Sequence, residues 1–265
     1  MSTKRRRGRN APGNPVALVT GGAHRIGRQI ALALARDGFD VAVHYGRSRD
    51  GALATVADVR KAGRQACAVR RDLAVARSLA SMLEECATSL GEVTCLVNSA
   101  SMFEADGALD FEPARLARHM GVNVAAPILL ASQLHARIAK GGQGVVINVL
   151  DQKLWNPNPD FLSYTLSKAA LCSATGLLAR ALAPKLRVVG LAPGITLPAA
   201  GQSRRNFDRV SRLTPLGYSS SPEDIAQAVV YLARARAVTG TTLLVDGGQH
   251  LVPSERDVMF LRGAR

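Results

Sequence analysis

A short apolar run, a turn bounded by glycines and an amphipathic segment follow one another near the beginning of the chain. Residues 15–20 are expected to form a buried strand, and residues 28–36 carry apolar side chains at the spacing of a helix. The turn between them begins with Gly21 and ends with Gly27. This order is typical of a dinucleotide-binding fold, because the glycines permit a tight turn and the helix N-terminus attracts pyrophosphate.

Apolar runs and helical patterns alternate along the rest of the chain. The further predicted strands are residues 40–45, 65–70, 94–98, 145–150, 187–192 and 243–248. The further predicted helices are residues 51–62, 76–90, 115–140, 163–171 and 222–235. This alternation predicts an α/β fold, a single Rossmann-type doubly wound parallel sheet of seven strands with helices on both faces.

One Rossmann-type domain is expected to span residues 14–252, between a basic disordered tail at 1–13 and a C-terminal tail at 253–265. Within the domain, the polar segment 197–215 lacks strong periodicity and is predicted to be a mobile lid. We find no internal repeat, linker or second domain.

The net charge of +14 is concentrated in part at the start of the chain, at Lys4, Arg5, Arg6, Arg7 and Arg9. We interpret this run as a solvated tail rather than a nucleic-acid arm or a targeting signal. The remaining positive balance suits a site for a phosphorylated cofactor. No segment resembles a secretory signal or approaches the length of a membrane span, so no membrane association is expected.

The chain has four cysteines, Cys67, Cys86, Cys95 and Cys172. No two of them have C-x-x-C spacing. Reduced thiols in a cytoplasmic protein are the expected interpretation. No group of His, Cys and carboxylate residues has the spacing of metal ligands, so we expect no metal.

The loop after the predicted strand 40–45 bears on the choice of nicotinamide cofactor. An NAD-selective site places an acidic residue near this strand end to bind the ribose hydroxyls, and the sequence has none there. Arg47 and Ser48 instead offer donors that suit a 2′-phosphate, which predicts NADPH, although an ordinary polar loop is the alternative. Asp72 and Leu73 follow the next strand, where an adenine edge could be bound.

Tyr164 and Lys168 stand four residues apart in a helical pattern, which puts both side chains on one helix face. An ammonium beside a phenol is expected to lower the pKa of the phenol, making Tyr164 a usable proton donor. Asp151 follows the predicted strand 145–150 and would emerge at its carboxyl end, where ligands bind. Asn123 lies at an irregularity in a helix and could bond a backbone carbonyl or a water in a proton path.

Other residues are candidates for contact with a substrate. Ser101 and Phe103 follow the predicted strand 94–98, and the ring of Phe103 would either stack on a flat ligand or belong to the core. Arg25 in the glycine turn either points away or reaches into the cofactor cleft. Trp155 is either a pocket wall or a loop anchor, and His119 is expected to be a solvated helix residue.

The chain resembles the short-chain dehydrogenase/reductase family over nearly its whole length. Four features carry this resemblance: Thr20 with the glycine turn, Asn98-Ser99-Ala100, Tyr164 with Lys168, and Pro193-Gly194. The resemblance implies a Rossmann fold, a nicotinamide cofactor, commonly a homotetramer, and a catalytic set of Asn123, Tyr164 and Lys168. Asp151 departs from the family pattern, because most members have serine at that position.

The departures resemble the pteridine reductase branch, in which the matching residues are Arg25, His44 to Ser48, Asn98 to Phe103, and Asp151. By this resemblance Arg25 and Ser101 contact cofactor phosphate and pterin, and Phe103 stacks the pterin. Ser99 stands where the branch often has asparagine. The implied cofactor contacts are Gly21, Arg25, Ile26, Gly27, His44, Tyr45, Arg47, Ser48, Asp72, Leu73, Asn98, Ser99, Ala100, Lys168, Pro193, Gly194 and Thr196.

The sequence therefore predicts an NADPH-dependent reductase of a pterin or dihydrofolate-like ring. The nicotinamide would give hydride, Tyr164 and Asp151 would give protons, and Lys168 would bind the nicotinamide ribose. A carboxyl group suits reduction of C=N, whereas in the alternative Asp151 only orients Tyr164 or a water. Two other functions stay open: a carbonyl reductase acting on a ketone or 3-oxoacyl thioester, and a non-catalytic NADPH sensor whose basic tail binds nucleic acid.

Overall fold

The computed structural model describes residues 13–199 and 201–261, and its strands form one parallel seven-stranded sheet. The strands are β1 Val16–Thr20, β2 Asp40–Tyr45, β3 Ala66–Arg70, β4 Val93–Asn98, β5 Gly144–Val149, β6 Leu186–Pro193 and β7 Thr242–Val245. They lie in the order β3-β2-β1-β4-β5-β6-β7. The direction of winding changes between β1 and β4, which creates a crevice at their carboxyl ends. The Rossmann-type prediction is confirmed.

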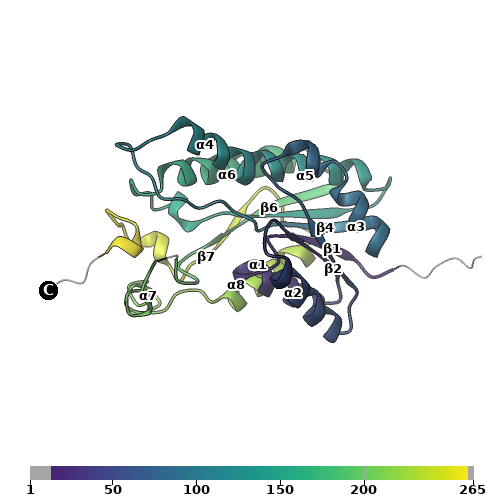
Figure 1. The fold of residues 1–265 in the computed structure, drawn as a ribbon, viewed down its shortest axis with the longest axis horizontal. Helices are drawn as coiled ribbons and strands as arrows, with labels where there is room; N and C mark the ends of the chain where they lie inside the picture. The colour runs from purple at the N-terminus through teal and green to yellow at the C-terminus, as the bar shows by residue number, and fades with distance from the viewer. Residues whose placement is uncertain (1–12, 200, 262–265) are drawn as a thin grey trace, which may run out of the picture.

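Helices cover both faces of the sheet. They are α1 Arg25–Arg36, α2 Arg49–Lys61, α3 Met82–Leu90, α4 Pro113–Met120, α5 Ala126–Arg137, α6 Leu162–Ala181, α7 Arg204–Ser211 and α8 Pro222–Arg234. Figure 1 shows α4, α5 and α6 on one face and α1, α2 and α8 on the other, while α3 packs beside α5. Among the helices of the described residues, none combines the length and apolar character needed to cross a membrane.

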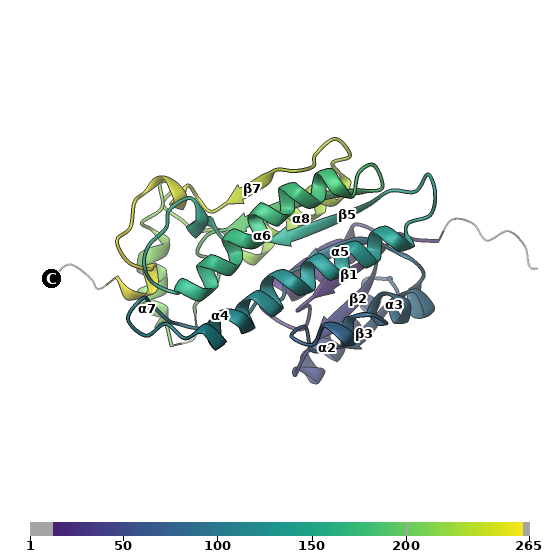
Figure 2. The same cartoon turned by 90° about the horizontal axis from the view of Figure 1, so that it is seen from above.

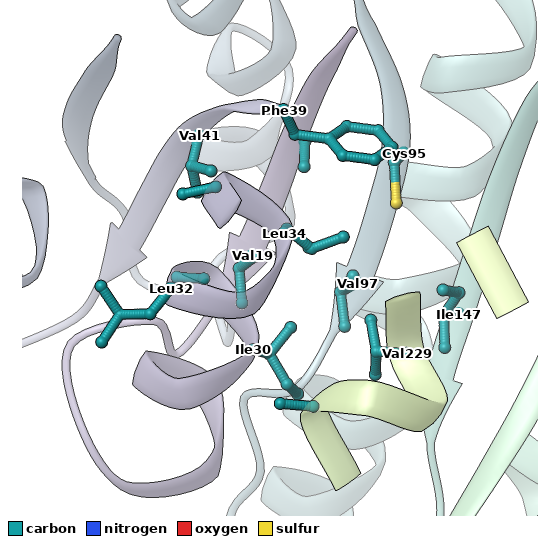
Figure 3. Packing of buried hydrophobic residues seen from close by; sticks show 14 of the residues in the cluster. Val19, Ile30, Leu32, Leu34, Phe39, Val41, Cys95, Val97, Ile147 and Val229 are labelled. Atoms are coloured by element: carbon teal, nitrogen blue, oxygen red, sulfur yellow. The ribbon is translucent and has the colours of Figure 1, made fainter. Parts of the chain in front are cut away.

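Two apolar clusters fill the spaces between the sheet and its helices. On one face, Ile30 of α1 and Val229 of α8 pack with Val97 of β4 and Ile147 of β5 (Figure 3). The opposite face joins apolar residues of α3, α5 and α6. Every residue of β1 is buried, as expected for a central parallel strand covered on both sides. This explains why the strands appear in the sequence as continuous apolar runs.

The predicted helix at 115–140 is divided by a widened turn at Gly121–Ala125 that follows α4 and precedes α5. Pro127 has no backbone N–H to donate within the regular pattern, so it favours such an irregularity. His119 is fully buried, and its Nδ1 donates to the Arg115 carbonyl at 2.9 Å. The prediction that His119 is solvated is therefore wrong, because α4 turns this residue inward where it packs on α6.

Two other predicted segments differ from the structure. The predicted helix at 76–90 is split into a 3-10 turn Ala76–Leu79 and α3, although Leu79, Met82, Leu83 and Cys86 are all buried as expected. The segment 197–215, which has no strong periodicity and was assigned no helix, contains α7, and its assignment as a mobile lid stays a prediction. Ser203 starts this helix, since its hydroxyl accepts from the backbone N–H of Asn206.

Candidate active site

A cavity of about 660 Å³ opens where the carboxyl ends of β1, β4, β5 and β6 meet. In Figure 2 the arrowheads of β5 and β7 point toward the end of the molecule where α7 and the C-terminal segment lie. The location is the one that open parallel sheets use for ligands. Most predicted site residues line it: Gly21, Arg25, Ile26, Gly27, Ser99, Ala100, Ser101, Phe103, Asp151, Tyr164, Lys168, Pro193, Gly194 and Thr196.

The phenol of Tyr164 and the carboxyl group of Asp151 meet in this cavity. Tyr164 lies in the first turn of α6, and its hydroxyl donates to Oδ2 of Asp151 at 2.7 Å. Asp151 follows β5 and is oriented by the backbone N–H of Lys153, which donates to Oδ1 at 2.9 Å. Burial raises the pKa of Asp151, and burial together with the Asp151 charge raises the pKa of Tyr164 well above its ordinary value. The pair therefore holds a proton on the phenol.

Lys168 lies one turn after Tyr164 but does not bond its hydroxyl. The buried ammonium donates to the Val149 carbonyl at 2.7 Å and stands 5.7 Å from the centre of the Tyr164 ring. Burial lowers the pKa of Lys168 to about 8. The prediction that Lys168 lowers the pKa of Tyr164 is wrong for this structure, because the Asp151 carboxylate is the group in contact with the phenol oxygen.

An aromatic wall stands beside the catalytic pair. Phe103 stacks on Phe161 with ring centres 4.3 Å apart and meets the edge of the Tyr164 ring at 4.6 Å. Phe161 is buried, takes a left-handed backbone conformation before α6, and stacks in turn on Phe260. Phe103 itself remains 46% exposed and lines the cavity, so its ring does not belong to the buried core.

Asn123 is buried behind the cavity and holds the loop after β4 in place. Its Nδ2 donates to the Met102 carbonyl at 3.0 Å and to the Ser167 hydroxyl at 2.9 Å, and its Oδ1 accepts from the Met102 N–H at 2.8 Å. The expected bond to a backbone carbonyl is thus present. The hydroxyl of Ser101 also donates to Asn123, at 3.4 Å.

The glycine turn has the close backbone contacts that a dinucleotide site requires. Gly21 has a φ of +67°, and a Cβ there would come within 2.9 Å of the Ala100 Cα. A Cβ on Gly27 would collide with the carbonyl of Gly21. Thr20 joins this turn to the next loop, because its hydroxyl accepts from the N–H groups of Ser99 and Ala100 at 3.0 and 3.1 Å. The first turn of α1 lines the cavity at Arg25, Ile26 and Gly27, and a helix N-terminus is suited to an anion.

His44 does not line the cavity but forms a hydrogen bond with the glycine turn. Its Nδ1 accepts from the backbone N–H of Gly21 at 3.1 Å, and its Nε2 donates to the Arg71 carbonyl at 3.2 Å. Burial lowers the pKa of His44 to about 4, so the ring is neutral near pH 7. A neutral ring is required here, because the Gly21 bond needs an unprotonated Nδ1.

The predicted residues that do not line the cavity are His44, Tyr45, Arg47, Ser48, Asp72, Leu73, Asn98, Asn123 and Trp155. Leu73 belongs to the apolar core, and the Asn98 amide donates to Asn148 on the neighbouring strand at 2.8 Å. Arg47 is exposed after β2 and forms no ion pair within the described part of the chain. An exposed arginine at this strand end that is not already engaged in an ion pair fits a 2′-phosphate.

The structure shows where Arg25 and Trp155 lie, for each of which the sequence left two alternatives open. Arg25 has a left-handed φ of 50°, lines the cavity, and donates to the Pro198 carbonyl at 3.0 Å. It therefore reaches across the cleft to the loop after β6. Trp155 is 40% exposed and lies outside the cavity lining, in a loop that Asn156 ties to the Val252 carbonyl at 2.5 Å.

The C-terminal segment forms a wall of the cavity that sequence reasoning missed. Asp257 pairs with the buried Lys153 at 3.2 Å, and Arg256 pairs with Asp160 at 2.9 Å. These pairs hold Met259 against the cavity. The lining residues not predicted are His24, Val149, Leu150, Gln152, Ile195, Leu197, Ala199, Gln202, Gln249, Asp257, Val258 and Met259. Their sequence signal is weak, since only their nearness to predicted strand ends and the apolar run 258–260 mark them.

Within the described residues, no group of three or more His, Cys, Asp and Glu side chains is arranged to hold a metal ion. The cavity lining includes the phenol of Tyr164, the carboxyl group of Asp151, the buried ammonium of Lys168 and the glycine turn.

A parallel sheet with a glycine turn and a Tyr-Lys pair at its switch point defines a Rossmann-type oxidoreductase. The family model described as enoyl-(acyl carrier protein) reductase matches residues 21–250. The chain belongs to the short-chain dehydrogenase/reductase family.

Similar proteins include both folate and carbonyl reductases. FolM alternative dihydrofolate reductase 1 from Brucella canis, solved with NADP, is 38% identical with a TM-score of 0.85, over 90% of this chain and 95% of that chain. The angucycline C-6 ketoreductase LanV, solved with NADP, is 30% identical with a TM-score of 0.83, over 90% and 96%. The 3-oxoacyl-[acyl-carrier-protein] reductase FabG of Staphylococcus epidermidis is 28% identical over 90% of this chain and 100% of its own length. The FolM likeness supports the pteridine reductase-like branch.

Proposed function

We propose that this chain is an NADPH-dependent reductase of a pterin or dihydrofolate-like ring. The observation that carries the proposal is the 2.7 Å hydrogen bond between Tyr164 and Asp151, beside the half-exposed ring of Phe103. A carboxyl group can bond the amidine-like edge of a pterin through two oxygens or pass it a proton, whereas a serine hydroxyl has one oxygen and is far too weak an acid. The similarity to FolM dihydrofolate reductase adds independent support.

NADPH, when bound, supplies the hydride. The glycine turn and the first turn of α1 would hold its pyrophosphate, and Arg47 with Ser48 would hold its 2′-phosphate. Lys168, fixed by the Val149 carbonyl, would bond the nicotinamide ribose.

The proton chemistry follows from the pair at the cavity wall. Tyr164 keeps its proton because its pKa is raised, and it directs that proton at Oδ2 of Asp151. The raised pKa of Asp151 brings this carboxyl group closer to the range where it acts as an acid near neutral pH. In its protonated form Asp151 would give its proton to a ring nitrogen beside it, and Tyr164 would pass its own proton to the carboxylate that is left. A proton from water would then restore the phenol.

Carbonyl reduction is the second candidate, and the FabG and LanV relatives favour it. Tyr164 would then give its proton to the substrate oxygen, and Asp151 would only orient the phenol. The two candidates differ in whether the reaction needs a carboxyl group at position 151.

The test measures NADPH oxidation by the full chain with dihydropterins, dihydrofolate, simple ketones and 3-oxoacyl thioesters. We expect kcat/KM to be highest for a dihydropterin or dihydrofolate. Turnover restricted to ketones or thioesters would reject the proposal in favour of the carbonyl reductase.

A further inference from the structure

A second cavity, of about 580 Å³, lies beside the first between α7 and the C-terminal segment. Met259 lines both cavities, so they are neighbours. Figures 1 and 2 both show α7 and the C-terminal segment at the same end of the molecule, and Figure 2 shows β5 and β7 running toward this end. We call this second space the basic cavity, because its lining among residues 13–199 and 201–261 includes Arg205, Arg209 and Arg256 but no acidic residue.

The three guanidinium groups differ in whether a carboxylate of the protein already neutralises their charge. Arg256 is neutralised by Asp160, with which it forms a two-pronged ion pair. Arg209 donates to the neutral Leu261 carbonyl, and that bond leaves its positive charge uncompensated. Arg205 is exposed and takes part in no ion pair among the described residues. The basic cavity therefore has a net positive charge and at least one guanidinium free to turn toward an anion.

A polar bridge continues from the first cavity into the basic cavity. Gln202 lines the first, and its Nε2 donates to Oδ1 of Asn206 at 2.7 Å. Asn206 lines the second and donates to the Leu261 carbonyl at 3.2 Å. A ligand held beside Phe103 that extends past Met259 would therefore run along hydrogen-bonding side chains toward the guanidinium groups.

We infer that the basic cavity binds the anionic end of an extended substrate, namely the glutamate carboxylates of a dihydrofolate. The inference rests on the proposed function and narrows it, since a pterin without a carboxylate has no group for this site. Guanidinium groups suit carboxylates because their paired N–H donors match the two oxygens. Of the two guanidinium groups that no carboxylate neutralises, Arg209 is held by the Leu261 carbonyl, whereas Arg205 has no side-chain hydrogen bond among the described residues. Arg205 would therefore determine specificity without taking part in the chemistry.

The test compares dihydrofolate with dihydrobiopterin, which has no carboxylate, in the full chain and in two variants. For Arg205→Ala we expect the ratio of the dihydrofolate KM to the dihydrobiopterin KM to rise about fivefold to tenfold, as for loss of one partly solvated charged contact. The kcat for dihydrofolate should stay unchanged. Arg204→Ala is the matched control, because Arg204 is adjacent, exposed and paired with Asp208, and it does not line the cavity.

The dependence of the dihydrofolate KM on salt concentration is a second measurement. In the unsubstituted protein the dihydrofolate KM should rise with NaCl more steeply than in Arg205→Ala. If Arg205→Ala leaves the KM ratio unchanged, or if Arg204→Ala changes it equally, the inference is overturned while the proposed function stands. If neither pterin is reduced and acetoacetyl-coenzyme A is, the proposed function and the inference fall together.

Discussion

The backbone N–H of Ser163 donates to the carboxylate of Asp106 at 3.0 Å, across 57 positions of sequence. The loop after β4 thereby caps the N-terminus of α6, whose own preceding residue, Phe161, offers no side-chain cap. The Ser163 hydroxyl donates to the same carboxylate. One buried aspartate thus fixes the end of the helix that carries both Tyr164 and Lys168.

Replacing this cap should destabilise the protein and misplace Tyr164. For Asp106→Ala we expect the free energy of unfolding to fall by about 1–2 kcal/mol, the usual loss when a helix cap is removed. We also expect a lower kcat. Urea unfolding and steady-state rates check this. Glu104→Ala is the control from the same loop, since Glu104 is exposed and its one ion pair among the described residues is with Arg118. Equal stability in the two variants would contradict the capping role.

The phenol of Tyr164 is expected to be indispensable for turnover. Tyr164→Phe keeps the ring packed against Phe103 but removes the donor, so kcat should fall by about 100-fold to 10,000-fold, the range for loss of a general acid. NADPH binding, measured by fluorescence titration, should be preserved. Tyr218→Phe, at an exposed position, is the control. Retained turnover in Tyr164→Phe would remove this residue as the proton donor.

His44 should make stability depend on pH between about 4 and 6.5. Its pKa is about 4 when folded and 6.5 ordinarily, so the unfolded chain binds more protons in this window and stability falls as pH decreases. The full contribution is about 3 kcal/mol. Asn at position 44 keeps an acceptor for the Gly21 N–H but cannot be protonated there. His44→Asn should therefore lose less stability than the unsubstituted protein between pH 6.5 and 4, and equal losses would contradict the prediction.

Arg47 is expected to select the phosphorylated cofactor. Arg47→Ala should weaken NADPH binding by about tenfold while leaving NADH nearly unaffected, because only NADPH has the 2′-phosphate. Calorimetric titration with both cofactors measures the difference. Arg36→Ala controls for the change in net charge, because Arg36 is exposed and lies at the C-terminal end of α1, away from the glycine turn. An unchanged preference would mean that another group reads the phosphate.

The strands were predictable because parallel strands buried on both faces leave unbroken apolar runs. The sequence pattern at 145–150 and β5 at Gly144–Val149 illustrate this agreement. The helix at 76–90 and the segment at 197–215 were predicted less well. Their structure depends on short local features, a 3-10 turn and the Ser203 cap, which hydrophobic periodicity does not register.

The structure places Tyr164, Lys168 and Asp151 around one cavity, as the sequence pattern predicted. The pattern did not reveal which two of these side chains are in contact. A separation of four residues predicts neighbouring side chains, yet the Tyr164 hydroxyl turns to Asp151 and Lys168 turns to a backbone carbonyl. The C-terminal wall could not be predicted at all. Its position depends on the pair between Lys153 and Asp257, which are 104 positions apart and belong to no periodic pattern.

The central claim is that the carboxyl group of Asp151 takes part in reducing a nitrogen heterocycle. The most direct test is kcat/KM of Asp151→Ser for a dihydropterin and for a ketone, both with NADPH. Serine restores the residue usual in the family and leaves Tyr164 in place, so we predict that dihydropterin reduction falls about 100-fold or more while ketone reduction is maintained or increased. Equal losses with both substrates would contradict the account and reduce Asp151 to a residue that orients Tyr164.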